Sequence, residues 1–253
     1  MSIVKTVDRA IDILNCFTVE QSELAVSEIA IRLSVHKSVA SRLAATLRLR
    51  DFLRMDPATR RYRIGKRVFE LGQLFDQQGS ISEIAMPHLR ALVRSVGHAS
   101  HVGVLEGRDV LIVSCVESDH QLQVAVRVGG KRPAHATASG KLFLAYGKLN
   151  VQEIANGNGR LPKVGPRTIE TVADMQKELA VIFKTGIAYN REESLRGVGA
   201  VAAPILSADD QILASLTTIF PLAVVDLIEL KRIGAEVAKA AGKISAQLAA
   251  ASR

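Results

Sequence analysis

The sequence predicts an α+β protein in two parts, a small N-terminal part made mainly of helices and a larger part with a mostly antiparallel sheet. Up to residue 96, apolar residues recur mostly at the three-to-four-residue spacing of helices, whereas after Gly97 the spacing changes to two, which is typical of strands. The 253 residues are 48% hydrophobic and 23% charged, an ordinary balance for a globular protein with one large or two modest domains. We therefore expect a first domain at residues 1–66 and a second at residues 67–253.

Three helices are expected in the first domain. Residues 5–17 form the first, with apolar residues such as Val7 and Ile11 on the face that packs behind the other two helices. Residues 24–32 and 37–47 form the next two, separated by a turn of about three residues. The last helix exposes donor-rich side chains around its first turn, where the helix dipole is positive. This pattern predicts a helix-turn-helix at about residues 26–45 with a recognition helix as its second member.

A basic hairpin is expected directly after these helices. Residues 51–55 and 61–64 are typical of two short strands, and Asp56 and Pro57 between them favour a turn. Such a hairpin would be the wing of a winged helix-turn-helix, at about residues 52–64. From Arg32 to Arg67 the chain has eleven Lys or Arg and two acids, a net charge of +9, while the whole chain carries +8. The positive charge is therefore local to this region.

This local charge predicts binding to nucleic acid, the alternative being a solvated basic face or a surface for a protein partner. Aromatic residues make up only 4% of the chain and Trp is absent, so few rings are available for base stacking and duplex DNA is the better partner. The side chains predicted to contact DNA are His36, Lys37, Ser38, Ser41 and Arg42 from the recognition helix, and Arg60, Arg61 and Tyr62 from the wing.

The sequence also indicates where the protein works. Cys16 and Cys115 lie far apart in segments expected to be buried, so they define no disulfide framework and favour a reducing compartment. The first twenty residues include acids among their apolar positions, unlike a signal peptide, and no apolar run reaches transmembrane length. We expect a cytoplasmic protein without a membrane partner.

Two amphipathic helical stretches, residues 68–75 and 81–96, are expected to connect the two parts. Residues 77–80 interrupt the pattern between them. Pro87 lies inside the second stretch and should bend or restart that helix.

The larger part is expected to be a sheet with helices on one side, a composition that suits a small-molecule pocket or an assembly surface. A hairpin turn is predicted at residues 106–109. Strands are predicted on both sides of it and at 122–128, 187–189, 200–206 and 212–219. Helices are predicted at 139–146, at 171–185 with Gly186 closing it, and after Pro221.

No nucleotide-binding loop is predicted. Residues 137–141 resemble the end of a phosphate-binding loop, but His135 stands where that motif has Gly, and Leu142 stands where it has Ser or Thr. Residues 197–202 have a loose dinucleotide-binding spacing, yet they run into a strand where that fingerprint requires a helix.

The other reactive side chains also lack the partners that a catalytic or metal site needs. His98 and His101 have no third ligand at metal spacing, and His135 has no acid placed to orient it towards a nearby serine. Glu192 and Glu193 are adjacent and point apart, which favours a solvated or capping role. We therefore predict no catalytic constellation, no metal and no cofactor.

Six segments resemble the IclR family of bacterial transcriptional regulators, and the match runs nearly the full length. They are VDRAIDIL (7–14), KSVASRL (37–43) and RYRIG (61–65) in the first domain, and RPAHATASGK (132–141), GIAYNREE (186–193) and VAAPI (201–205) in the second. The resemblance implies a winged helix-turn-helix joined by a helical linker to a GAF-like effector-binding domain, in a homodimer or a dimer of dimers.

The resemblance also implies an effector cavity in the second domain. Backbone amides of Ala138 and Ser139, at a helix N-terminus, would hold a carboxylate. The other lining residues implied by similarity are Asn190, Val198, Ala200, Thr217 and Ile219. Family members often have Asp at the position of Asn190, and hydroxyl or thiol side chains at those of Ala200 and Ile219, so the cavity expected here is less acidic and more apolar.

These observations predict a transcriptional regulator that senses a small carboxylate or aromatic metabolite and controls a metabolic operon. Two other hypotheses remain at this stage. One is an enzyme in the second domain that uses His135 or Glu192, and the other is a DNA-binding protein that responds to no ligand. The effector, the operator, the sign of regulation and the number of subunits do not follow from the sequence.

Overall fold

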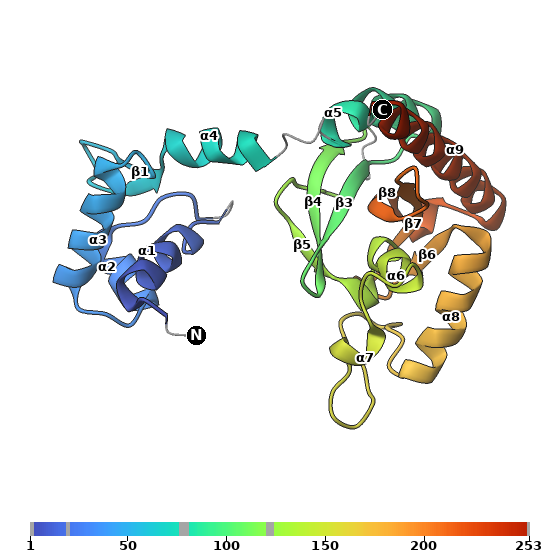
Figure 1. The fold of residues 1–253 in the computed structure, drawn as a ribbon, viewed down its shortest axis with the longest axis horizontal. Coiled ribbons are helices and arrows are strands. Elements are labelled where there is room, and N and C mark those ends of the chain that lie inside the picture. Colours follow the sequence, from blue (N-terminus) through green and yellow to red (C-terminus); the bar gives the residue numbers. More distant parts are fainter. Residues whose placement is uncertain (1–2, 19–20, 76–80, 120–123, 252–253) are drawn as a thin grey trace. The chain divides into compact units, whose positions relative to one another are not determined.

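The computed structural model describes residues 3–18, 21–75, 81–119 and 124–251 (Figure 1). The chain divides into two compact units, residues 1–77 and 78–253. The division falls after α4 (Lys66–Phe75), whereas the sequence analysis draws the domain boundary before this helix. The interruption predicted at residues 77–80 lies outside the described residues.

The first unit is a winged helix-turn-helix, as predicted. Before α4 it contains α1 (Lys5–Asn15), α2 (Val26–Arg32), α3 (Lys37–Leu49), β1 (Leu53–Met55) and β2 (Tyr62–Ile64). The strands form an antiparallel hairpin. The core of the unit takes side chains from all five elements and from the segment before α2: Ile13, Leu24, Ile29, Ala30, Ala40, Ala44, Leu53 and Tyr62. Burial of this shared cluster holds the hairpin against the helices.

Two details of the first unit differ from the prediction. Val7 and Ile11 of α1 are 56% and 52% exposed, whereas Ile13 is fully buried. Apolar residues lie on more than one side of this helix, so the helical period alone does not select the inner face. Leu24 precedes α2 because its backbone pairs with Tyr62, with N–H to oxygen bonds whose N–O distances are 3.0 and 2.7 Å.

The second unit contains a six-stranded sheet in the order β5-β4-β3-β8-β7-β6, with all neighbours antiparallel. Its strands are β3 (Ser100–Glu106), β4 (Asp109–Val116), β5 (Lys131–Pro133), β6 (Ala188–Arg191), β7 (Val198–Leu206) and β8 (Ile212–Pro221). Its α-helices are α5 (Ile81–Val96), α6 (Ala138–Ala145), α7 (Val151–Ile154), α8 (Val172–Thr185) and α9 (Leu227–Ala251). Short 3-10 helices occupy Ala134–Ala136 and Leu222–Val224. The predicted α+β class is confirmed.

Helices cover both faces of this sheet, which corrects the prediction of helices on one side (Figure 1). Val201 and Ala203 of β7 pack with α5 and α9, whereas Ala200 and Ala202 pack with α6 and α8. Strands buried on both faces have apolar residues in a nearly continuous run, and β7 (VGAVAAPIL) has this pattern. We call the side covered by α6 and α8 the α6 face.

The structure departs from the predicted elements in two places. Residues 124–128 of the strand predicted at 122–128 form no strand, and residues 120–123 lie outside the described part of the chain. Val126 is buried there against Ala99 and Ile112, so the alternating pattern comes from packing without a ladder. Helix α5 continues through Pro87, so of the bend or restart expected at this residue, the restart does not occur. The closure of α8 by Gly186 is confirmed: its φ of 69° is a left-handed conformation that favours glycine.

Candidate functional site

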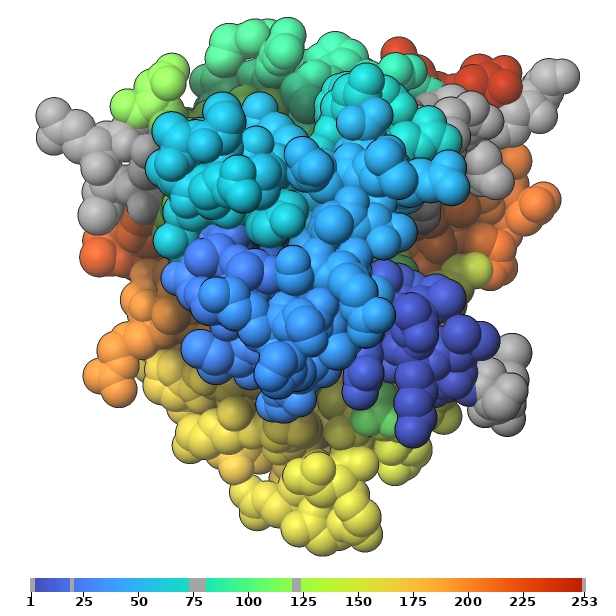
Figure 2. Space-filling model, turned by 90° about the vertical axis from the view of Figure 1, so that its left-hand side faces the viewer, coloured from blue at the N-terminus to red at the C-terminus, as the bar shows by residue number. Residues whose placement is uncertain are grey.

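The exposed side of α3 brings together the five residues that the sequence assigns to a recognition helix. All five are exposed, and the blue side chains of α2 and α3 lie on the face that Figure 2 turns to the viewer. They are His36, Lys37, Ser38, Ser41 and Arg42. The opposite side of α3 is anchored by Ala40 and Ala44, which are fully buried. The helix is therefore held from behind while its polar side and its positive N-terminus remain accessible.

His36 also caps the N-terminus of this helix. It is the N-cap of α3, and its Nδ1 lies 3.4 Å from the backbone nitrogen of Ser38 and 2.8 Å from the Ser38 hydroxyl. The cap orders the first turn, from which Lys37 projects. A ring that caps a helix is held in one orientation, so His36 contributes to the surface as a fixed group.

Asp56 stabilises the turn of the wing. Its Oδ1 accepts hydrogen bonds from the backbone nitrogens of Ala58 and Thr59, both at 2.9 Å. These bonds, that from Thr59 first, lower the pKa of the Asp56 carboxyl. Arg60 follows with a left-handed φ of 58° and an exposed side chain. Arg60 thus lies at the tip of the hairpin, where the sequence analysis places a DNA contact.

The other two wing residues have different positions. Arg61 is half-buried and its Nη2 lies 2.6 Å from Glu28 Oε2 of α2, with a second bond to the Glu23 carbonyl at 3.3 Å. Tyr62 is 7% exposed and belongs to the core of the unit. The structure therefore gives Tyr62 a packing position, because its strand pairs with Leu24 as well as with β1.

Sequence reasoning missed this link between the wing and α2. Arg63 forms an ion pair with Glu23, parallel to the pair of Arg61 with Glu28. The Glu28 carboxylate also accepts a bond from the Ala25 nitrogen at 2.6 Å, and this bond and the Arg61 guanidinium lower its pKa. The available signal is the i, i+2 spacing of two arginines in the segment predicted as a strand at 61–64, which directs both to one side.

The second candidate site is the α6 face. Residues directly opposite each other in antiparallel strands point to the same face, so the ladder Asn190–Ala200–Ile219 forms one row and His101–Thr217–Ala202 the next. Val198 is two residues from Ala200 and shares its face. The N-terminus of α6 supplies Ala138 and Ser139. The structure thus places all seven residues of the predicted effector site on this face.

Hydrogen bonds tie the start of α6 to the sheet. Ser139 Oγ lies 2.6 Å from Thr217 Oγ1, and both side chains are buried. Thr137 caps the helix, its Oγ1 accepting a bond from the Gly140 nitrogen at 3.1 Å. A Cβ at Gly140 would lie 2.1 Å from the Ala134 carbonyl oxygen, so only glycine allows this approach.

Asn190 has a structural connection within this face. Its Nδ2 donates to the Ala136 carbonyl at 2.6 Å, and its Oδ1 accepts from the Glu193 nitrogen at 3.2 Å. Both ends of the amide are therefore engaged with backbone groups. Asn190 fixes the segment before α6 against the turn that follows β6.

A buried ionic cluster beneath α6 was not predicted. Lys141 is fully buried, with its Nζ 2.8 Å from Glu193 Oε1 and 2.9 Å from Glu178 Oε1. Burial raises the pKa of the Glu193 carboxyl, an effect that the nearby Lys141 ammonium opposes. Of the solvated or capping role expected for the two glutamates, the solvated one does not hold for Glu193, which is buried. Glu192 points elsewhere, towards the Gly197 nitrogen at 2.8 Å and Arg167 at 3.3 Å.

The histidines considered as metal or catalytic residues are separated. His135 Nε2 lies 2.8 Å from the Pro162 carbonyl oxygen, while the hydroxyl of Ser139 bonds to Thr217. His98 contacts the ring of Phe220, with centroids 5.7 Å apart. Among the described residues no group of three or more His, Cys, Asp or Glu is placed to hold a metal ion.

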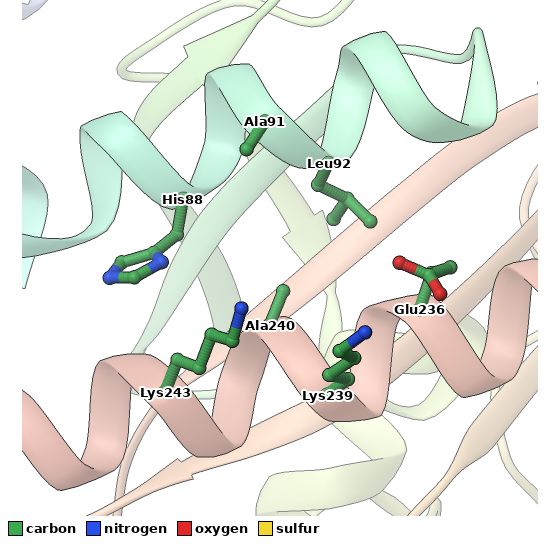
Figure 3. A pocket seen from close by; sticks show the side chains of 7 residues that line it. All are labelled: His88, Ala91, Leu92, Glu236, Lys239, Ala240 and Lys243. Carbon is green, nitrogen blue, oxygen red and sulfur yellow. The ribbon is translucent and has the colours of Figure 1, made fainter.

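A shallow hollow lies on the opposite side of the sheet, between α5 and α9 (Figure 3). It is lined by His88, Ala91, Leu92, Glu236, Lys239, Ala240 and Lys243. His88 Nε2 is 2.9 Å from Gln247 Oε1. Because α5 and α9 cover the other face, the sheet separates this hollow from the α6 face. In the described parts of the chain, no helix is long and apolar enough to span a bilayer.

Comparisons with known proteins agree with this arrangement. The model of the IclR helix-turn-helix domain matches residues 6–57, and that of the bacterial transcriptional regulator IclR C-terminal domain matches residues 76–246. The chain is 28% identical to the HTH-type transcriptional regulator XynR of Escherichia coli over 86% of each chain. It is also 28% identical to the HTH-type transcriptional regulator BhcR of Paracoccus denitrificans, over 96% of this chain and 86% of that one.

Solved structures share the fold over the full length. An IclR homologue of Microbacterium hydrocarbonoxydans in complex with 4-hydroxybenzoate superposes with a TM-score of 0.87 at 24% identity, covering 97% of this chain and 99% of the other. IclR of Thermotoga maritima superposes with a TM-score of 0.78 at 24% identity, covering 98% and 100%. The two family models together span both units, and this chain therefore belongs to the IclR family of bacterial transcriptional regulators.

Proposed function

We propose that the first unit binds duplex DNA with α3 in the major groove and the wing on the backbone. Base edges and nearby phosphates are contacted by Lys37, Ser38, Ser41 and Arg42. The His36 ring, which caps α3, lies beside them. Arg60 contacts a phosphate from the tip of the wing. The carrying observation is the exposed donor row of α3, which stands on a buried Ala40–Ala44 base.

Arg61 and Tyr62 influence DNA binding indirectly, by positioning the wing. The ion pair of Arg61 with Glu28 and the burial of Tyr62 support a positioning role, in which they set the angle of the wing against α2. A symmetric dimer would place two copies of α3 on a near-palindromic site, with half-sites separated by about one helical turn or a multiple of it.

The effector is a small carboxylate bound on the α6 face. The N-terminus of α6 offers backbone amides to an anion, at the edge of a face whose strands are largely apolar. The 4-hydroxybenzoate bound by the structurally similar homologue is an aromatic carboxylate, which supports this class. Binding would change DNA affinity to the extent that the ligand prefers one arrangement of the dimer, and the controlled operon would be metabolic.

The test is fluorescence-anisotropy titration of the DNA upstream of the protein's own gene, against a scrambled duplex and across a salt series. Tight, sequence-selective binding with a steep salt dependence is expected. A panel of small carboxylates then identifies those that shift the titration. Equal affinity for both duplexes, with and without the carboxylates, would reject the proposal.

A further inference from the structure

His101 lies on the α6 face within the region proposed for the effector. The ladder places it directly opposite Thr217 on one side and Cys115 on the other, with Cα separations of roughly 5 Å for such pairs. Thr217 in turn bonds to Ser139 at the start of α6. His101 is therefore one strand further across the sheet than Thr217, whose hydroxyl pairs with Ser139 at the helix N-terminus.

One ring nitrogen of His101 is buried without the hydrogen bond that such burial normally requires. Only 7% of the residue is exposed, and its Nδ1 has no hydrogen-bond partner among the described residues. Burial lowers its pKa to about 4, so the ring is neutral at neutral pH, with one nitrogen donating and the other accepting. Buried polar atoms in native structures are nearly always partnered, so this one calls for a group that the described residues do not supply.

The neighbouring polar groups on the α6 face are already occupied. Ser139 and Thr217 bond to each other, and the Cys115 thiol donates to the Val126 carbonyl with an S–O distance of 3.6 Å. The surrounding side chains are apolar, including Ile112 and Ile219. His101 is thus an unpartnered polar group at an apolar end of the face.

We propose that His101 is a ligand-contacting residue that forms a hydrogen bond with a hydroxyl group of the effector. A hydroxyl both donates and accepts, so it satisfies a neutral imidazole in either tautomer. The inference rests on the proposed function: the effector's carboxylate lies at the N-terminus of α6, and its hydroxyl lies at His101. The effector is therefore a hydroxycarboxylate.

The test uses matched pairs of carboxylates with and without a hydroxyl, 4-hydroxybenzoate with benzoate and 3-hydroxypropionate with propionate. Isothermal titration calorimetry on the full chain compares the wild type with His101→Leu and His101→Gln. In at least one pair the hydroxylated member should bind the wild type about tenfold more tightly, which is the size of one net hydrogen bond. The preference should disappear in His101→Leu and partly remain in His101→Gln, whose amide also donates and accepts.

Ser114 provides a matched control. Its buried Oγ also has no partner in the described structure, but it lies opposite Val102 and faces the α5 and α9 side of the sheet. Ser114→Ala should leave the preference for the hydroxyl unchanged. Nitrogen NMR of the wild type tests the contact without any substitution. Addition of 4-hydroxybenzoate should shift the His101 ring nitrogen signals more than addition of benzoate does.

The outcomes separate the two proposals. Binding of both members of each pair with equal affinity, or a hydroxyl preference that survives in His101→Leu, overturns the role of His101 and leaves the carboxylate site standing. If no carboxylate of the panel binds the wild type, the carboxylate assignment itself is wrong and the inference about His101 is rejected with it.

Discussion

Lys141 and Glu193 meet in the interior of the second unit, with Nζ and Oε1 2.8 Å apart, although 52 positions separate them in the chain. Lys141 is fully buried, and the Glu193 side chain is 10% exposed. Thr168 Oγ1 donates to the Glu193 carbonyl at 2.6 Å, so the glutamate is held through its backbone as well. The pair joins α6 to the turn after β6, the two segments that border the proposed effector site.

Replacing Lys141 should strongly destabilise the second unit. Lys141→Met would leave the buried Glu193 carboxylate without its cation, and we expect the free energy of unfolding to fall by about 3–5 kcal/mol. Urea denaturation measures the loss. Lys177→Met is the control because its pair with Asp174 is exposed, and it should leave stability nearly unchanged. Equal effects of the two variants would contradict a structural role for the buried pair.

Arg42 should determine a base preference. Arg42→Ala removes an exposed guanidinium from the outer side of α3 while leaving the buried Ala40 and Ala44 in place. We expect a loss of about 1–3 kcal/mol on the specific site and relaxed selectivity at one base pair. Competition binding with a library of single-base operator variants measures both. Uniform weakening across the library would instead assign Arg42 to the phosphate backbone.

Arg61→Ala should weaken binding to all sequences alike, because its guanidinium holds the wing to α2 through Glu28. Glu28→Gln provides the discriminating comparison, since it breaks the same ion pair and keeps the arginine. If positioning is the role of Arg61, both variants weaken DNA binding. If Arg61 contacts phosphate directly, Glu28→Gln binds as well as the wild type or better.

Tyr62 should tolerate loss of its hydroxyl and not loss of its ring. Tyr62→Phe keeps the packing in the core of the first unit and should leave DNA affinity unchanged. Tyr62→Ala creates a cavity there, and we expect the stability to fall by about 3–5 kcal/mol, as for other large aromatic truncations. Thermal denaturation and anisotropy give the two readouts. A selective loss of DNA affinity in Tyr62→Phe would restore Tyr62 as a direct contact.

The second unit should lose stability as the pH falls through the range in which His101 resists protonation. Burial lowers the pKa of His101 from 6.5 to about 4, so the unfolded chain binds a proton there before the folded one does. Above about pH 6.5 the ring is neutral in both states and costs no stability. Between about pH 6.5 and 4 the free energy of unfolding falls, by up to about 3 kcal/mol.

Denaturant titrations of the wild type and of His101→Gln across this pH range measure the effect. Burial raises the pKa of Glu193, which contributes with the opposite sign, and the difference between the two proteins cancels this contribution. The difference should shrink or change sign as the pH falls. Parallel pH profiles would show that His101 does not titrate in this way.

Local pattern was enough to predict the helix-turn-helix and the hairpin of the first unit. The α2–turn–α3 sequence, the Asp56 turn and the concentration of Lys and Arg all depend on residues close in the chain, and the exposed row on α3 lies where its period placed it. The resemblance of short segments to a known family likewise indicated the residues of the α6 face, and the strand register brings them together.

Tertiary structure decided what periodicity leaves open. In α1, apolar residues on several sides compete for the core, and only packing against α2 and α3 selects Ile13 over Val7 and Ile11. At residues 124–128 the alternation indicated a strand. Val126 instead packs against Ile112, and the strand that pairs with β4 at this edge of the sheet is β5. A lone lysine or histidine has no sequence signature for its partner. The fold determines which distant groups share a buried volume: Lys141 meets Glu193, whereas the Nδ1 of His101 meets no partner within the described ranges.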